Sequence, residues 1–370
     1  MPVLARATGM LPRMRRVALL GATGSIGRQA IEVVAAHPDL ELCALQSGST
    51  SLEALAAEHR VQHVQVGGDA VGLLERSEPD VVLNAVVGFA GVGATLWALE
   101  HGVTLALANK ESLVAAGELA IRARRRGEGL LLPVDSEHSA LWQCLEGRDP
   151  ETVAGLVLTA SGGPFRGRSR AELTDATAAD ALAHPTWNMG PKITVDSATL
   201  ANKGLELIEA HWLFALPYQR IEVVVHPTSV VHALARFRDG ALLAHVGLPD
   251  MRVPISYALT YPDRAATPVP QLDLVGLDLS FEAPDLDAFP LLALARACGE
   301  RGGTAPCAFN AANEVAVEAF LAARIGFLEI AAIVEETLSR VDGAAARDLD
   351  DLMAADAEAR RLAARGLQPA

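Results

Sequence analysis

Short apolar runs alternate with amphipathic stretches over the first third of the chain. The strand-like runs are rich in Val, Leu and Ala, and they span residues 16–20, 40–46, 64–66, 81–86, 105–108 and 130–133. Apolar positions at helical spacing lie between them, over residues 28–37, 52–58, 94–101 and 111–125. Because strands that alternate with helices predict a doubly wound parallel sheet, we expect an α/β fold with a Rossmann-like domain over residues 1–134.

After residue 135 the apolar runs become longer and are joined by short turns. Strands are expected over residues 153–160, 221–225, 229–237 and 241–246, which predicts an α+β catalytic domain with an antiparallel part over residues 135–261. Residues 262–290 are rich in proline and lack periodicity, so we interpret them as a linker. A C-terminal helical domain is expected over residues 291–370, with helices at 291–298, 308–323, 328–340 and 348–365.

Composition narrows the class of partner. A chain of 370 residues, 51% of them apolar, is long enough for two or three cores. Its formal net charge of −14 disfavours nucleic acid and anionic membranes, and we interpret the basic runs at residues 13–16 and 124–126 as solvated. No apolar run has membrane-spanning length. We therefore expect a small-molecule partner, no nucleic acid and no membrane.

Cysteine usage and the N-terminal segment indicate the compartment. The four cysteines lie far apart and form no CxxC motif, which predicts free thiols in a reducing cytoplasm for Cys43, Cys144, Cys298 and Cys307. The N-terminal MPVLARATGMLPRMRR is basic but lacks the apolar region of a secretion signal. We interpret the first fourteen residues as a frayed tail, with Met14 as an alternative start.

A glycine-rich segment, GATGSIG at residues 21–27, joins the first predicted strand to the first predicted helix. Such glycines permit a tight turn and let backbone N–H groups approach a pyrophosphate, although an ordinary glycine-rich turn is the alternative. Ser47-Gly48-Ser49-Thr50 follows the second strand, where NAD-selecting domains place an acid. Because two hydroxyls stand there instead of a carboxylate, we predict NADPH rather than NADH.

Two acidic clusters lie in the expected catalytic domain. If Asp135-Ser136-Glu137-His138 is extended, Asp135 and Glu137 point the same way, as half of a hard-cation site. A solvated strand end is the alternative. Asn202 and Lys203 are spaced i, i+4 and i, i+3 from Glu206, so they share a region of helix surface, either in a site or as a solvated Lys–Glu pair.

Three further features frame this second cluster. Asp196 or Ser197 is expected to cap the helix that carries it. Ser161-Gly162-Gly163-Pro164 follows a predicted strand and is suited either to bind phosphate or to form an ordinary turn. Residues 184–191, HPTWNMGP, fit neither helix nor strand, which predicts a flap that excludes water from a ligand. A loop whose Trp fills the edge of a core, with a structural His, is the alternative.

Taken together, the chain resembles the 1-deoxy-D-xylulose-5-phosphate reductoisomerase family. The matching segments occur in order along nearly the whole chain: GATGSIG, ALANKESLV, VDSEHSA, TASGGPFRG, HPTWNMGPKITVDSATLANKGLE, VHPTSVVHA, GLPDMRVPI and FNAANEVAV. The long HPTWNMG…NKGLE segment is highly specific. One departure is that the family often has a basic or amide residue after the second strand, where this chain has Ser49 and Thr50.

The resemblance implies roles for individual residues. The metal ligands would be Asp135, Glu137 and Glu206, for Mg²⁺ or Mn²⁺, with Co²⁺ as a third option. Substrate contacts would come from Ser136, Glu137, Ser161, His184, Trp187, Ser197, Asn202, Lys203 and Glu206. The cofactor would contact Gly21, Thr23, Gly24, Ser25, Ile26, Gly48, Ser49, Thr50, Asn109, Lys110, Glu111, Met189 and Gly190. Catalytic roles would fall to Lys203, Glu137, His138, His184 and His232.

The resemblance also implies a reaction and an assembly. A sugar phosphate, 1-deoxy-D-xylulose 5-phosphate, would be rearranged by a retro-aldol and aldol step. NADPH would then reduce the product to 2-C-methyl-D-erythritol 4-phosphate, in the MEP pathway of isoprenoid precursors. A cytoplasmic homodimer is implied. The rival functions are another NADP-dependent dehydrogenase, of the semialdehyde or homoserine type, which would not need three carboxylates, and a non-enzymatic NADP-binding sensor.

Overall fold

The computed structural model describes residues 14–367, which divide into two compact units. The first unit holds residues 14–109, 120–154 and 235–272, and the second holds residues 110–119, 155–234 and 273–367. The tail expected at the N-terminus lies, up to residue 13, outside the described residues. None of the described helices is both long and apolar enough to cross a bilayer.

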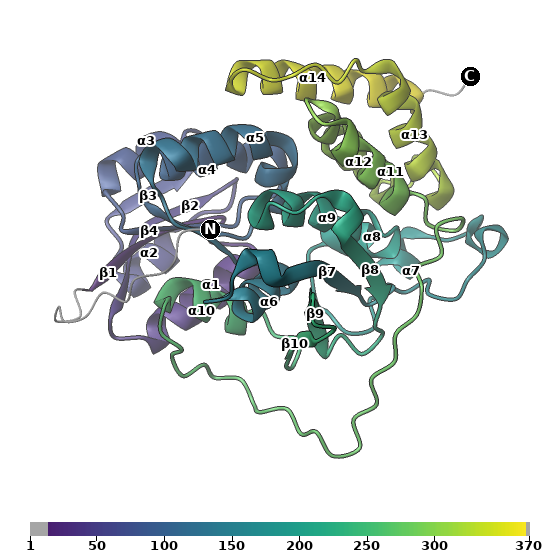
Figure 1. The fold of residues 1–370 in the computed structure, drawn as a ribbon. Helices are drawn as coiled ribbons and strands as arrows, with labels where there is room; N and C mark the ends of the chain where they lie inside the picture. Colours follow the sequence, from purple (N-terminus) through teal and green to yellow (C-terminus); the bar gives the residue numbers. More distant parts are fainter. Residues whose placement is uncertain (1–13, 368–370) are drawn as a thin grey trace. The chain divides into compact units, whose positions relative to one another are not determined.

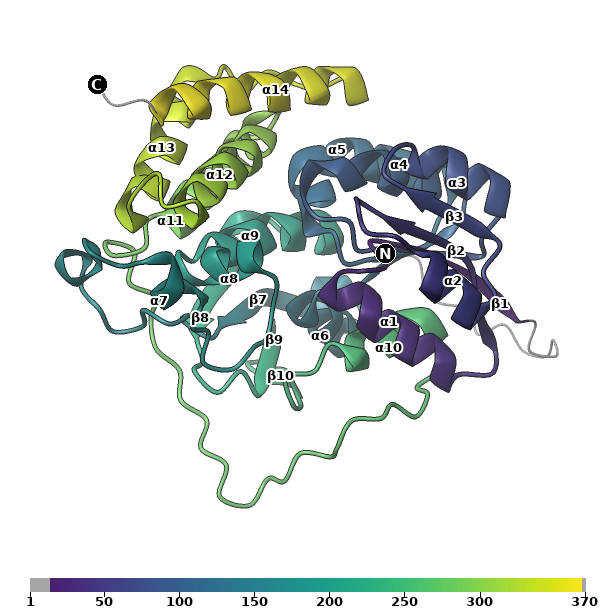
Figure 2. The same ribbon diagram turned by 180° about the vertical axis from the view of Figure 1, so that it is seen from behind.

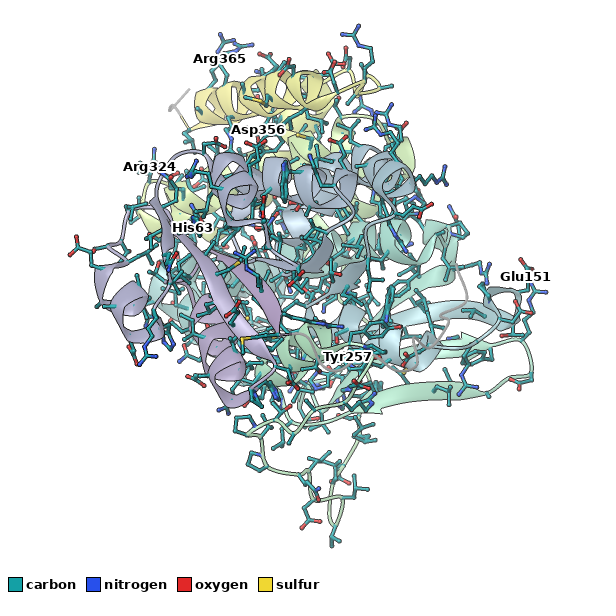
Figure 3. The ribbon with its side chains drawn as sticks, turned by 90° about the vertical axis from the view of Figure 1, so that its left-hand side faces the viewer. His63, Glu151, Tyr257, Arg324, Asp356 and Arg365 are labelled. Carbon is teal, nitrogen blue, oxygen red and sulfur yellow. The ribbon has the colours of Figure 1, made fainter. Side chains whose placement is uncertain are left out.

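A six-stranded parallel sheet forms the core of the first unit (Figure 1). Its order is β3-β2-β1-β4-β5-β6, and the strands are β1 (Arg15–Leu20), β2 (Leu40–Ser47), β3 (His63–Val66), β4 (Val81–Asn84), β5 (Thr104–Leu107) and β6 (Leu131–Pro133). The central strands are buried because helices cover both faces of a doubly wound sheet. β3, which carries His63, is an edge strand (Figure 3). The predicted Rossmann-like sheet is confirmed.

Helices connect these strands. They are α1 (Ser25–Ala36), α2 (Glu53–His59), α3 (Ala70–Ser77), α4 (Val92–Glu100) and α5 (Lys110–Gly127), with a 3-10 turn, η1 (Gly88–Gly91), before α4. α3 is not among the helices predicted from the sequence. α10 (Arg252–Thr260) packs against α1, where Nε2 of His37 lies 3.2 Å from Oγ of Ser256 (Figure 2). α5 is kinked at Ala116.

Residues 136–145 form a helix, α6 (Ser136–Leu145), and Asp135 is its N-cap residue. The extended conformation considered for Asp135–His138 is therefore not the one that this segment adopts. Nδ1 of His138 lies 3.2 Å from Oδ1 of Asp135, an i, i+3 contact that a helical turn makes and an extended strand does not. Asp135 and Glu137 thus stand at the start of a helix, where the dipole favours acidic groups.

A second sheet has the order β10-β9-β7-β8. Its strands are β7 (Val153–Ala160), β8 (Ile221–Val225), β9 (Val231–Phe237) and β10 (Leu242–Val246), flanked by η2 (Pro150–Thr152) and η4 (Tyr218–Arg220). β7 and β8 are parallel, with Leu156 opposite Ile221. A tight turn at Gly240 joins the neighbours β9 and β10, as expected for the antiparallel part. Residues 262–290 have little regular structure, with one isolated bridge between Val225 and Glu282.

The second unit is otherwise mainly helical. Two short elements come first, η3 (Arg170–Leu173) and α7 (Ala178–Leu182). The longer helices are α8 (Pro191–Ala198), α9 (Ala201–Phe214), α11 (Leu291–Arg301), α12 (Ala305–Leu321), α13 (Phe327–Arg340) and α14 (Leu349–Gly366). α12 packs against α13 and α14, and α11 packs against α9 (Figures 1 and 2). The four predicted C-terminal helices are confirmed. Asp196 and Ser197 lie inside α8, and Leu200 precedes α9, so the cap predicted for them is wrong. Pro191, which favours the first helical position, starts a helix before them.

Candidate active site

In the glycine turn before α1, backbone segments pack so closely that side chains would not fit between them. Gly21 has a φ of +80°, and a Cβ placed there would lie 2.4 Å from the carbonyl oxygen of Ala85. A Cβ on Gly27 would lie 2.3 Å from the carbonyl oxygen of Gly21. Thr23, Gly24 and Ser25 are half-buried or exposed, and no side chain caps α1. The N-terminus of this helix therefore presents free N–H groups of the kind that bind a pyrophosphate.

Three side-chain amides hold the loops around the turn, a role that was not predicted from the sequence. Oε1 of Gln46 accepts the Gly21 N–H at 3.1 Å. Nδ2 of Asn84 donates to the carbonyl of Gly91 and to Oγ1 of Thr95, both at 2.9 Å. Nδ2 of Asn109 donates to the carbonyls of Val86 and Gly88. Asn109, predicted as a cofactor contact, thus orders the loop after β4.

The end of β2 is open to solvent. Gly48, Ser49 and Thr50 are exposed, and nothing lies within 4 Å of a Cβ placed on Gly48. Oγ of Ser47 donates to the carbonyl of Thr50 at 2.5 Å and bends the chain there. The hydroxyls of Ser49 and Thr50 are therefore accessible, and no acidic residue stands within this segment.

The first acidic cluster is tightly organised within the first unit. Asp135 and His138 are buried, and their side chains meet at 3.2 Å. Oγ of Ser136 donates to Oε2 of Glu137, whose side chain is half-buried. The carboxylates of Asp135 and Glu137 are thus each oriented by a neighbour, as metal ligands usually are.

Glu206 is a buried carboxylate held by two buried ammonium groups in the second unit. Nζ of Lys110 lies 3.0 Å from its Oε1, and Nζ of Lys203 donates to its Oε2. Nδ2 of Asn202 donates to Oε1 at 2.6 Å, and Lys110 also donates to Oδ1 of Asn202 at 2.9 Å. The predicted proximity of Asn202, Lys203 and Glu206 is confirmed, and burial excludes the solvated alternative. Lys110, predicted as a cofactor contact, lies here against Glu206, a position that the sequence did not indicate.

Two serines and a histidine meet in the same unit. Nε2 of His184 lies 2.9 Å from Oγ of Ser161 and 3.2 Å from Oγ of Ser197. Oγ of Ser161 also accepts the Gly163 N–H at 3.1 Å. A Cβ on Gly163 would lie 2.9 Å from the carbonyl oxygen of Ser197, so only glycine lets this turn pack so closely on α8. We call Ser161, His184 and Ser197 the hydroxyl cluster.

The contacts of His184 define its tautomer. Its Nδ1 accepts backbone N–H groups from Trp187 at 2.9 Å and Thr186 at 3.2 Å, so the proton of the neutral ring is on Nε2. Burial lowers its pKa below 6.5, which favours this neutral form. With Gly163 and His184 donating to Ser161, the serine hydroxyl proton is left for a further acceptor such as a phosphate oxygen.

The loop at 184–190 connects α7 to α8. The indole of Trp187 lies near the imidazole of His232, with 6.3 Å between ring centroids. Met189 is half-buried, and the carbonyl of Gly190 accepts from Oγ1 of Thr194 at 2.8 Å. Hydrogen bonds therefore fix the loop at both ends, through His184 at its start and through the first turn of α8 at its end.

The carboxylate of Glu111, another predicted cofactor contact, forms an ion pair with a lysine. Nζ of Lys192 lies 3.4 Å from Oε1 of Glu111 and 2.8 Å from Oδ2 of Asp196. Burial acts to lower the pKa of Lys192, but the two carboxylates hold it above its ordinary value. Lys192 thus remains a cation that links α5 to α8.

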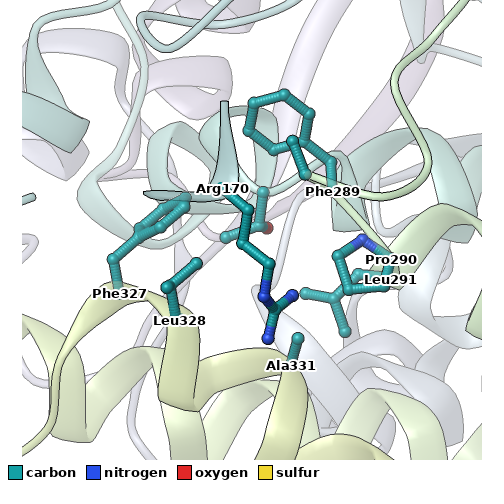
Figure 4. A pocket seen from close by; sticks show the side chains of 9 residues that line it. Arg170, Phe289, Pro290, Leu291, Phe327, Leu328 and Ala331 are labelled. Atoms are coloured by element: carbon teal, nitrogen blue, oxygen red, sulfur yellow. The ribbon is translucent and has the colours of Figure 1, made fainter. Parts of the chain in front are cut away.

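A hollow elsewhere in the second unit is apolar and separate from these groups. Arg170 extends into it between Phe327, Leu328 and Leu291 (Figure 4). Its wall contains none of the predicted site residues. We therefore assign the chemistry to the polar clusters and not to this hollow.

Comparison with known proteins identifies the family. The matching family models are described as "DXP reductoisomerase C-terminal domain" (residues 246–362), "1-deoxy-D-xylulose 5-phosphate reductoisomerase C-terminal domain" (131–214) and "1-deoxy-D-xylulose 5-phosphate reductoisomerase" (17–71 and 52–117). The reductoisomerase of Xanthomonas campestris pv. campestris (strain B100) is 49% identical, over 96% of this chain and 97% of the relative. That of Heliobacterium modesticaldum is also 49% identical, over 95% and 97%.

Comparison with solved structures leads to the same family. The Zymomonas mobilis reductoisomerase in complex with NADPH is 41% identical, with a TM-score of 0.88 over 97% of this chain and 100% of that one. A reductoisomerase in complex with NADPH, fosmidomycin and magnesium is 39% identical, with a TM-score of 0.89 over 95% and 98%. Because sequence and structure agree over nearly the full length, the chain belongs to the 1-deoxy-D-xylulose 5-phosphate reductoisomerase family.

Proposed function

We propose that this chain rearranges 1-deoxy-D-xylulose 5-phosphate and reduces it, with NADPH and a divalent cation, to 2-C-methyl-D-erythritol 4-phosphate. Apart from family membership, one observation carries the proposal. Glu206 is buried between Lys110 and Lys203, and the hydroxyl cluster lies in the same unit. A negatively charged chain therefore contains a local concentration of cations and donors suited to a sugar phosphate.

The glycine turn fits the cofactor. Gly21 and Gly27 leave room only for backbone, and the uncapped start of α1 would hold the pyrophosphate. The exposed hydroxyls of Ser49 and Thr50 would contact the ribose 2′-phosphate, since no acid there would repel it. NADPH would supply the hydride for the reduction. Contacts from Met189 and Gly190 to the cofactor belong to the same proposal.

The acidic residues fit a hard cation. Asp135, Glu137 and Glu206 would provide carboxylate oxygens, the ligands that Mg²⁺ and Mn²⁺ prefer. A bound ion would act as a Lewis acid on the carbonyl of the substrate. His138 would keep Asp135 oriented through their 3.2 Å contact, and Ser136 would orient Glu137.

The remaining residues would bind and shield the substrate. The hydroxyls of Ser161 and Ser197, both of which lie against Nε2 of His184, would donate to the phosphate, with Asn202 and Lys203 nearby on α9. Lys203 would also keep a fixed positive charge beside developing negative charge on the substrate. The loop at 184–190, with Trp187 against His232, would exclude water from the reactive intermediate.

A cytoplasmic homodimer completes the proposal. β10 is an edge strand with exposed Leu242 and Val246, and the loop at 262–290 exposes Leu274 and Val275. Unpaired edges and exposed apolar side chains are features that a second copy would cover. Light scattering on the purified chain tests this. A monomer mass at micromolar concentration would refute it.

The activity itself is tested by nicotinamide absorbance with purified chain, NADPH and 1-deoxy-D-xylulose 5-phosphate. We expect absorbance loss that a chelator abolishes and added Mg²⁺ or Mn²⁺ restores. A plain dehydrogenase would retain turnover in chelator, and a cofactor sensor would bind NADPH without absorbance loss. In Glu206→Gln we expect metal-dependent turnover to disappear while NADPH binding persists, because only an anionic ligand is lost.

A further inference from the structure

α12 holds α8 through a buried polar contact. Asn313 is fully buried, and its Nδ2 donates to Oδ1 of Asp196 at 2.7 Å. Asp196 is only 1% exposed, so water does not replace this donor. The two residues are 117 positions apart in the sequence. A C-terminal helix therefore fixes a side chain of the helix that carries Ser197.

The other oxygen of Asp196 is also engaged. Lys192, one turn earlier on α8, donates to Oδ2 at 2.8 Å and lies 3.4 Å from Glu111 on α5. Asn313, Asp196, Lys192 and Glu111 thus form a chain of contacts from α12 through α8 to α5. Each carboxylate in it has a donor, as buried carboxylates require.

α8 depends on such contacts. It has only eight residues, and helices of that length are not stable without tertiary packing. Its first residue follows the loop at 184–190, and Ser197 is adjacent to Asp196. A shift of α8 would therefore move both the end of the loop and the Ser197 hydroxyl relative to Ser161 and His184.

We propose that Asn313 is a positioning residue for the phosphate of the substrate. It acts through Asp196, by holding α8 so that the Ser197 hydroxyl stays in the hydroxyl cluster. This inference rests on the phosphate role proposed above for that cluster. It assigns a role in substrate affinity to α12, none of whose residues was predicted to contact a ligand.

The chain supplies a matched control on the same helix. Asn310 is one turn away from Asn313, is also fully buried, and donates to a carboxylate, Oε1 of Glu314, at 2.9 Å. Glu314 is in turn bound by Arg360 of α14, which also binds Asp356 (Figure 3 labels Asp356 on α14). The hydrogen bond of Asn310 is thus to a carboxylate on its own helix that α14 also binds, whereas that of Asn313 is to Asp196 of α8.

The experiment compares Asn313→Asp with Asn310→Asp. Each variant keeps the shape of the side chain, removes a donor and places a carboxylate against a carboxylate. The readouts are the inhibition constant of inorganic phosphate against 1-deoxy-D-xylulose 5-phosphate and the KM for NADPH. We expect Asn313→Asp to weaken phosphate inhibition by about tenfold or more, the effect of one lost charged hydrogen bond, with the KM for NADPH unchanged. Asn310→Asp should change phosphate inhibition much less, because its new carboxylate faces Glu314 and not Asp196.

Further variants keep the test decisive. Asn313→Ala removes the donor without adding charge and should weaken phosphate inhibition less. The double variant Asn313→Asp with Asp196→Asn reverses donor and acceptor and should recover part of the loss. Equal effects of the 313 and 310 variants, or no effect of either 313 variant on phosphate, would overturn the inference. Ser197→Ala distinguishes the two proposals. If it leaves phosphate inhibition unchanged, the proposed phosphate role itself fails.

Discussion

Nζ of Lys110 lies 3.0 Å from Oε1 of Glu206, and both side chains are at least nine-tenths buried. Lys203 binds the other carboxylate oxygen, so two ammonium groups share one anion away from water. These two positive charges lie in a chain whose formal net charge is −14. Fixed positive charge of this kind is suited to an anionic substrate.

Removing that anion should destabilise the ligand-free protein. In Glu206→Ala, Lys110 and Lys203 lose their shared counterion and remain buried. We expect the free energy of unfolding to fall by about 3–5 kcal/mol, as when one partner of a buried ion pair is removed. Urea unfolding of the metal-free chain measures this. Glu206→Gln, which keeps an acceptor oxygen, should lose less. Equal stability of wild type and Glu206→Ala would mean that the ammonium groups find other partners.

The glycine turn gives a prediction about backbone geometry. Gly21→Ala requires a positive φ from alanine and a Cβ that clashes with the carbonyl of Ala85. We expect about 2–5 kcal/mol of destabilisation from strain and overpacking, together with weaker NADPH binding. Gly48→Ala is the control, since nothing lies within 4 Å of its Cβ and its φ is not positive. Denaturant unfolding of both variants should separate them clearly, and similar midpoints would contradict the close approach.

Much of the fold was predictable because its signals are local. The buried parallel strands are continuous apolar runs, and each was found within a few residues of its observed bounds. α3 was missed, a short helix of eight residues with a polar face. The helix that starts at Ser136 was not predicted, although an N-cap residue and a carboxylate in the first turn favour a helix there.

The site was predictable only in part. Asn202, Lys203 and Glu206 lie within five positions, so helical spacing was sufficient to bring them together. Lys110 is 96 positions from Glu206, and no local pattern indicates that contact. The same holds for Asn313 and Asp196. Such pairs are fixed by how helices pack, which spacing along one helix does not encode.

His184 joins the loop backbone to the two serines through different ring nitrogens, and two variants should separate these functions. In His184→Asn the side-chain oxygen can replace Nδ1 as the acceptor of the loop N–H groups, but no donor reaches the serines. In His184→Gln the side-chain NH2 can replace Nε2 as the donor to the serines, but no acceptor stays near the loop N–H groups. We expect His184→Asn mainly to raise the KM for the sugar phosphate, because the donor to Ser161 and Ser197 is lost. His184→Gln should mainly lower kcat, because the N–H of Trp187 loses its acceptor. The same change in KM and kcat for both would contradict a two-sided role.

His184 should also make stability depend on pH. Burial holds its pKa below 6.5 in the folded chain, so the unfolded chain takes up the proton first as pH falls. Its contribution to stability is therefore complete above pH 6.5 and declines as pH falls through the window below. We expect the difference in unfolding free energy between wild type and His184→Asn to shrink on acidification from pH 7.5. A difference that does not change with pH would mean that the imidazole has the same pKa in the folded and unfolded chains, which would contradict the shift.

Cofactor choice should depend on charge at the end of β2. Ser49 is exposed and its segment has no acidic residue, so Ser49→Asp would place a carboxylate where the 2′-phosphate is proposed to bind. We expect the KM for NADPH to rise by about tenfold or more through like-charge repulsion, while the KM for NADH changes little or falls as the acid accepts from the 2′-hydroxyl. Ser49→Asn is the control, because it has the same shape without the charge and should stay close to wild type. Steady-state kinetics with both nucleotides decide the matter. If Ser49→Asp raised the KM for NADPH and NADH equally, the 2′-phosphate would be held elsewhere.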